Sequence, residues 1–158
     1  MTMIISKSEY MMFLKQPAWL WLKKHDKAKL PEVDQALQAM FDNGHLVETY
    51  AEKLFPNSTL LGFNGYQEYI TLPKRTTDAI ENGTKTILQG RVGTDNITCI
   101  FDVLDRVEGN VFDLYEIKSS TSVKIDHEYD LAFQVVVLEL AGLTIRNVGV
   151  IHVNNQYV

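Results

Sequence analysis

Apolar residues recur with the period of a helix in five stretches of the chain. Ser6 and Glu9 have the spacing of a capping box, which predicts a helix start at that point. Pro17 is expected to divide the first helical stretch in two, and Asn43-Gly44 to interrupt the third. The predicted helices span about residues 7–15, 17–24, 31–54, 73–82 and 126–141.

Short runs of β-branched and aromatic residues, bounded by turn residues, predict strands. These strands span about residues 60–63, 66–72, 84–92, 97–107, 111–119 and 144–153. Glu108-Gly109-Asn110 predicts a hairpin between two of them. The last strand–helix–strand unit predicts a right-handed crossover between parallel strands. The chain is therefore expected to form an α/β fold with a central mixed sheet flanked by helices.

The composition narrows this picture to one globular domain. With 158 residues and 46% hydrophobic content, residues 1–158 can form a single core. The apolar runs are too short to cross a bilayer and the N-terminus lacks a signal pattern, so a cytoplasmic location without a membrane partner is expected. A single cysteine, Cys99, excludes an intrachain disulfide and any cysteine-built zinc or iron–sulfur site.

The net charge bears on the class of partner. A formal charge of −5 argues against a protein that coats nucleic acid without specificity, because phosphate binding favours basic surfaces. Two divalent cations would offset four of these negative charges. The charge is therefore compatible with a nuclease whose carboxylates hold metal.

The candidate chemistry lies on the two hairpin strands. Along the second strand, Glu116 and Lys118 share a face and lie roughly 7 Å apart. Asp102 lies within an apolar stretch of the first strand. Burying these charges without partners costs several kcal/mol each, so they pair or bind something. Asp102, Glu116 and the Ile117 carbonyl offer the oxygen ligands that a hard divalent cation prefers.

The acid-x-Lys triplet has little meaning without this context. In a chain with 20 acidic residues, chance supplies about one such triplet. Glu116 and Lys118 could simply form an ion pair along one strand. Asp130, near the start of the last helix, suits the helix dipole and is interpreted as a structural acid first, with a place at the rim of a site second.

Several segments carry a family resemblance. The segments that carry it are ISKSEYMMFLKQPAWLWL, GHLVETYAEKLFP, FDVL, YEIKSST, HEYDLAFQ and VGVIHVNNQYV. Together they cover nearly the whole length. The chain resembles the RecB-like exonuclease branch of the PD-(D/E)XK nuclease superfamily, which implies a restriction-endonuclease-like core.

The resemblance implies a metal site with Mg²⁺ or Mn²⁺. Asp102, Glu116 and the backbone carbonyl of Ile117 would be its ligands. Glu48 stands where many relatives have a metal-binding histidine, and a carboxylate there is also compatible with a metal. The alternative for Glu48 is a carboxylate on the surface of a helix.

The resemblance also implies catalytic roles for Asp102 and Glu116 as metal ligands, for Lys118 as the catalytic lysine, and for Gln134 as the glutamine that orients the phosphate or the lysine. The alternative for Gln134 is a hydrogen-bonded amide in the core. The chain departs from the family pattern in several places. Phe101 stands at the proline position, Gln16 at the cysteine position of iron–sulfur members, and Leu138 at a common tyrosine position.

The expected function is that of a metal-dependent DNA nuclease that hydrolyses phosphodiesters with an activated water. The resemblance favours exonuclease-like action on DNA ends or single strands, by a homo-oligomer or with a partner subunit. The alternative is a catalytically silent nuclease-fold module that binds nucleic acid or assembles with a larger DNA-processing complex. An enzyme acting on RNA is a third hypothesis, although no feature of the sequence points to recognition of a 2′-hydroxyl.

Overall fold

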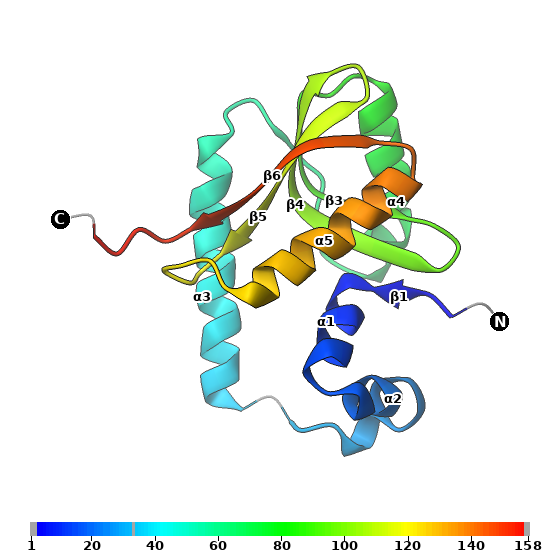
Figure 1. Ribbon diagram of the computed structural model, residues 1–158, viewed down its shortest axis with the longest axis vertical. Coiled ribbons are helices and arrows are strands. Elements are labelled where there is room, and N and C mark those ends of the chain that lie inside the picture. Colours follow the sequence, from blue (N-terminus) through cyan, green and yellow to red (C-terminus); the bar gives the residue numbers. More distant parts are fainter. Residues whose placement is uncertain (1–2, 33, 157–158) are drawn as a thin grey trace.

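The computed structural model describes residues 3–32 and 34–156, with the backbone alone for Leu37. It contains a six-stranded mixed sheet and five α-helices packed against it, which confirms the predicted fold class (Figure 1). The strands are β1 (Ile5–Ser6), β2 (Thr59–Leu60), β3 (Thr86–Gly93), β4 (Ile97–Glu108), β5 (Val111–Lys118) and β6 (Thr144–His152). The helices are α1 (Lys7–Lys15), α2 (Pro17–His25), α3 (Gln35–Ala51), α4 (Tyr66–Glu81) and α5 (Ile125–Leu140). Within the described ranges, no helix is long and apolar enough to cross a membrane.

The sheet has the order β2-β3-β4-β5-β6, and β1 pairs with β4 beside this path. β4 runs antiparallel to β3 and β5, and the β4–β5 hairpin turns at Gly109, whose φ of +47° favours glycine. β5 and β6, which precede and follow α5 in the sequence, pair in parallel, as the predicted crossover requires. The hairpin and the crossover are therefore both confirmed.

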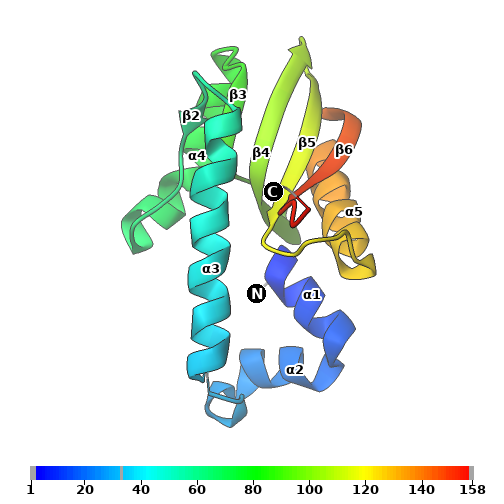
Figure 2. The same cartoon turned by 90° about the vertical axis from the view of Figure 1, so that its left-hand side faces the viewer.

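Two apolar clusters hold the helices to the sheet. In one cluster, Leu104 and Leu114 pack with Leu131 and Leu138 of α5. In the other, Val103 and Ile117 pack with Ala51 of α3. Because neighbouring residues of a strand point to opposite faces, α5 and α3 cover opposite faces of β4 and β5. Figure 2 shows the two helices on either side of these strands.

The N-terminal segment joins the sheet before it becomes helical. Ser6 caps α1, since its hydroxyl accepts a hydrogen bond from the Glu9 N–H and the Glu9 carboxylate accepts one from the Ser6 N–H, which confirms the capping box. Pro17 begins α2, as predicted. α1 packs against α5, where the rings of Tyr10 and Phe133 stack with centroids 4.8 Å apart.

The prediction of a strand at residues 66–72 and of a helix beginning at Pro73 is wrong. Both stretches belong to the single helix α4, which contains Pro73. A proline inside a helix leaves the carbonyl four residues earlier without its donor. That carbonyl belongs to Tyr69, and the Arg91 guanidinium on β3 lies 3.5 Å from it. A residue from the sheet therefore compensates for the lost helical bond, which no local pattern could reveal.

Three boundaries also differ from the prediction. α3 continues through Asn43 and Gly44, because packing of its C-terminal half on the sheet outweighs the roughly 1 kcal/mol that a helical glycine costs. It begins at Gln35 and continues into a 3₁₀ turn, Glu52–Leu54, whereas the predicted start at residue 31 includes Val33, which lies outside the described residues. The strand predicted at residues 60–63 is reduced to Thr59–Leu60.

Candidate functional site

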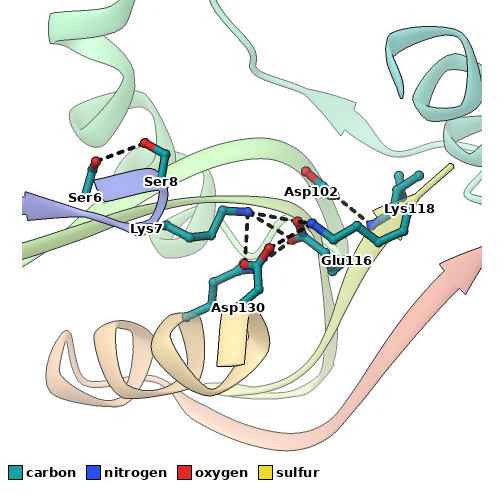
Figure 3. A network of polar contacts seen from close by, with 9 residues as sticks. Ser6, Lys7, Ser8, Asp102, Glu116, Lys118 and Asp130 are labelled. Carbon is teal, nitrogen blue, oxygen red and sulfur yellow. Dashed lines mark hydrogen bonds and ion pairs between the residues drawn. The ribbon is translucent and has the colours of Figure 1, made fainter. Parts of the chain in front are cut away.

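The candidate site lies where β4 and β5 stop pairing. Their last paired residues are Val103 and Tyr115. Beyond this point the Asp102 side chain replaces the backbone, since its Oδ2 accepts a hydrogen bond from the Ile117 N–H at 2.7 Å (Figure 3). Thr98 of β4 pairs with β3 on one edge and with β1 on the other. β1 therefore takes the edge of β4 that β5 has left, and brings the start of α1 to the site.

Glu116 is the centre of the site and is buried. Its Oε1 lies 2.7 Å from the Lys118 Nζ, and its Oε2 accepts a hydrogen bond from the Gln134 Nε2 at 2.7 Å. The Lys7 Nζ donates to both oxygens, at 2.9 and 3.2 Å. One carboxylate from β5 thus joins side chains from α1 and α5.

Asp130 of α5 repeats the same set of partners. Its carboxylate lies 2.8 Å from the Lys118 Nζ and 3.4 Å from the Lys7 Nζ. The Gln134 Nε2 donates to it at 2.8 Å, so the same amide nitrogen bonds both carboxylates. Two ammonium groups and one amide therefore lie between two buried acids, as Figure 3 shows for the charged groups.

Asp102 has a different electrostatic environment. Burial, and after it the nearby Glu116 charge, raise the pKa of its carboxyl to about 7, although Lys7 and the Ile117 N–H act to lower it. Glu48 contributes the weakest of these effects. Among the described residues no ion pair includes Asp102. Lys7 therefore acts on this carboxyl only through its charge, without an ion pair.

The two lysines remain ammonium ions at neutral pH. Burial alone would lower the pKa of Lys118, but Glu116 and Asp130 outweigh it and the pKa is raised. The same acids raise the pKa of Lys7 against an even larger effect of burial. In turn Lys7 and Lys118 hold the pKa of Asp130 below its usual range despite burial. The two lysines thus form ion pairs with Glu116 and Asp130, and neither forms one with Asp102.

The structure brings Asp102, Glu116, Lys118 and Gln134 together, as the sequence analysis expected. The alternatives raised there describe real contacts as well. Glu116 and Lys118 do form an ion pair along β5, and Gln134 is a fully buried amide with hydrogen bonds. Both contacts belong to one network that spans β5 and α5. The Ile117 side chain packs in the core while its N–H bonds Asp102.

Glu48 lies outside this network of contacts. It is carried by α3 on the opposite face, its side chain is 29% exposed, and its carboxylate lies 3.4 Å from the His45 ring. Its charge nevertheless acts on Asp102. Glu48 therefore acts on the site only through its charge and has no direct contact with the other predicted residues, so its role as a metal ligand stays a prediction.

Two residues of the site were missed as site residues in the sequence analysis. Asp130 lies one helical turn before Gln134, so the spacing on α5 could have placed them together. Lys7 carries no such signal. It reaches the site because β1 pairs with residues of β4 that are distant in the chain. A non-local pairing of two residues per strand is too short to recognise in a sequence.

The donor set suits a hard divalent cation. Within the described residues, no group of three or more His, Cys, Asp or Glu side chains is arranged to hold a metal. Mg²⁺, however, usually takes one or two carboxylates and retains several waters. Asp102 and Glu116 supply two buried carboxylates. Gln134 Oε1 has no hydrogen-bond partner among the described residues, and a hydrated cation brings donors that suit such an atom.

Comparisons with known proteins yielded no match. No protein-family model matches the chain, and no curated protein and no solved structure matches it either. The site must therefore be interpreted from its own residues.

Proposed function

We propose that this protein is a metal-dependent DNA nuclease of the RecB-like kind. The observation that supports the proposal most is the meeting of Asp102, Glu116, Lys118 and Gln134 in one buried cluster. In the sequence, the chemistry of Asp102, Glu116 and Lys118 and the family resemblance of Gln134 point to these four residues, and hydrogen bonds connect them to one another and to Ile117. Asp102, whose pKa is about 7, is the member of this cluster that most needs a cation.

In this proposal Asp102, Glu116 and the Ile117 carbonyl hold Mg²⁺ or Mn²⁺. When bound, the cation lowers the pKa of the attacking water and offsets negative charge on the phosphate. The water would add to phosphorus in line with the departing oxygen and lose one proton to solvent, while one P–O ester bond breaks and the departing oxygen takes up a proton from solvent. The configuration at phosphorus inverts.

The chain's own groups orient this reaction. Lys118 is held by Glu116 and Asp130, and its raised pKa keeps it protonated. It therefore acts as a cation and hydrogen-bond donor to the phosphate oxygens, and is unsuited to accept a proton from water. Gln134 bonds both carboxylates through one nitrogen and fixes their orientation. Glu48 adds negative charge from α3 and would stabilise a second cation.

A cleavage assay tests the proposal. Linear duplex, circular duplex, single-stranded DNA and RNA are incubated with the protein in Mg²⁺ or Mn²⁺ and, separately, in chelator. Asp102→Ala and Lys118→Ala are assayed beside Asp113→Asn, which changes a carboxylate of the same hairpin outside the site. Metal-dependent cleavage lost in the first two variants alone supports the proposal. Cleavage that resists chelator, or full activity in Asp102→Ala and Lys118→Ala, rejects it.

A second candidate is a catalytically silent nuclease-fold module. Lys7 favours it, because its ammonium bonds both oxygens of Glu116 and so partly takes the place of a cation. A cluster closed by its own lysines would serve stability and assembly. Isothermal titration with Mg²⁺ separates the candidates, since a silent module gives no heat of binding at Asp102 and no difference between the wild type and Asp102→Asn.

A further inference from the structure

A cavity of about 550 Å³ opens beside the candidate site. Asp102 and Lys7 form part of its wall, so it is continuous with the proposed cation site. The remaining wall comes from β1, α1, α2, α4, β3 and β4, with Lys23, Lys24 and Arg91 among its residues. These three side chains have no part in the proposed reaction.

The wall of this cavity is cationic although the chain as a whole is acidic. Lys23 and Lys24 share one acid, since both lie near Glu9 Oε1, at 3.5 and 2.8 Å. Lys24 also donates to the Ile4 carbonyl at 3.2 Å. One carboxylate therefore balances two ammonium groups. With Lys7 and Arg91 the wall carries four cations against the two acids Glu9 and Asp102. A positive wall in a chain of charge −5 indicates an anionic ligand.

Arg91 is held rigidly for such a role. Its Nε donates to Thr98 Oγ1 at 3.1 Å, its Nη1 lies 3.5 Å from the Tyr69 carbonyl, and its guanidinium lies 4.3 Å from the centre of the Tyr69 ring. The Tyr69 carbonyl is free to accept because Pro73 lacks the N–H that a helix would supply. No hydrogen bond within the described residues uses Nη2. A planar donor fixed on three sides suits a phosphate oxygen.

We propose that Lys23, Lys24 and Arg91 bind the phosphates of a single DNA strand next to the phosphate that is cleaved. This inference rests on the proposed function for the identity of the neighbouring site. The cavity has the size of a small-molecule site, which accommodates nucleotide units and excludes a duplex. The strand would pass from α2 and β3 toward Asp102 and Lys118. The substrate class is thus single-stranded DNA, or the unpaired end of a duplex.

Binding of a fluorescent oligonucleotide in chelator tests this inference without any cleavage. The probe is a single strand of roughly 12 nucleotides, within the usual site size for such proteins. Its affinity for the wild type is compared with that for Lys23→Gln/Lys24→Gln and for the control Lys27→Gln/Lys29→Gln. Both double variants remove two charges from neighbouring turns, but Lys27 and Lys29 lie outside the cavity. Thermal unfolding verifies that both variants are folded.

The cavity variant is expected to bind about tenfold more weakly. The slope of log affinity against log salt concentration is expected to become less negative by about 1.4, which corresponds to two lost phosphate contacts. The control should bind like the wild type, and Lys23→Arg/Lys24→Arg should retain affinity. Equal losses in both glutamine variants, no binding by the wild type, or equal competition by duplex or by a mononucleotide would overturn the inference. Strand binding without cleavage would instead reject the proposed function alone.

Discussion

The β4–β5 hairpin carries two pairs of facing acids, and the two pairs differ in the cations that contact them. Asp105 and Asp113 lie directly opposite each other in the ladder. Asp102 and Glu116 occupy the corresponding position three residues on, where the ladder has stopped. Because strand side chains alternate, the two pairs point to opposite faces of the sheet.

Each acid of the first pair has its own cation. Lys85 lies 2.8 Å from Asp105, which also accepts a hydrogen bond from Thr86 Oγ1 at 2.6 Å. Arg146 bonds both oxygens of Asp113, at 3.0 and 2.6 Å, and the pKa of Asp113 is lowered chiefly by these bonds. Two like charges face to face are thereby stabilised as two separate ion pairs.

The second pair lacks this balance. Glu116 forms ion pairs with the lysines of the site. Asp102 accepts a hydrogen bond from a backbone N–H, and the pKa of its carboxyl is raised to about 7. Facing acids in a hairpin therefore do not by themselves make a cation site. The proposed function places the metal at the pair whose charge is left uncompensated, and the following predictions test this difference.

The largest expected effect is on cleavage. Glu116→Gln keeps the size and most hydrogen bonds of the side chain but removes the charge that would hold the cation and Lys118. The rate of DNA cleavage is expected to fall by at least about 100-fold, since even residues behind metal ligands contribute 10- to 100-fold. Asp113→Asn should stay within about twofold of the wild type. Similar rates for the two variants would remove the distinction between the pairs.

The cations of the two pairs should differ in their contribution to stability. Lys7→Met leaves Glu116 and Asp130 with one lysine in a buried setting, and should lower the free energy of unfolding by about 3 kcal/mol. Lys85→Met removes an ion pair whose lysine is 65% exposed, and should cost less than about 1 kcal/mol. Urea unfolding in chelator measures both. A larger loss for Lys85→Met would contradict the assignment of the buried network.

Metal should stabilise one pair and not the other. At Mg²⁺ concentrations far above its dissociation constant, the free energy of unfolding of the wild type should rise by about 2 kcal/mol. Asp113→Asn should show the same shift in thermal midpoint, and Asp102→Asn should show none. A shift that persists in Asp102→Asn would mean that the cation binds elsewhere.

The smallest expected effect has opposite signs at the two pairs. In chelator at about pH 8, Asp102→Asn should raise the free energy of unfolding by about 1 kcal/mol, because it removes an uncompensated charge and retains an acceptor for the Ile117 N–H. Asp113→Asn should lower it by about the same amount, since it removes a charge-assisted bond to Arg146.

The first of these effects should depend on pH. The folded-state pKa of Asp102, about 7, lies above its ordinary value of 3.8, so the folded chain binds the proton more tightly. The cost of the Asp102 charge to the fold therefore grows as pH rises from about 4 to about 7 and keeps its full value above pH 7. The gain from Asp102→Asn should shrink between about pH 8 and pH 5 in urea unfolding. A gain independent of pH would show that charge is not its cause.

Much of the fold could be predicted because its signals are local. The capping box, Pro17 and the Gly109 turn each act within a few residues, and all three were confirmed. α4 was missed because the strand-like pattern of residues 66–72 and the position of Pro73 both argued against a helix. The compensation by Arg91 comes from another part of the sheet.

The sequence by itself determined that Asp102, Glu116 and Lys118 would meet, because hairpin geometry and side-chain alternation follow from residues close in the chain. The same geometry places Asp105 opposite Asp113. Only the tertiary structure decided which cations reach each pair, through Lys85, Arg146 and Lys7. Those cations reach the acids from distant parts of the chain, and the balance of buried charge depends on distances that no local pattern contains.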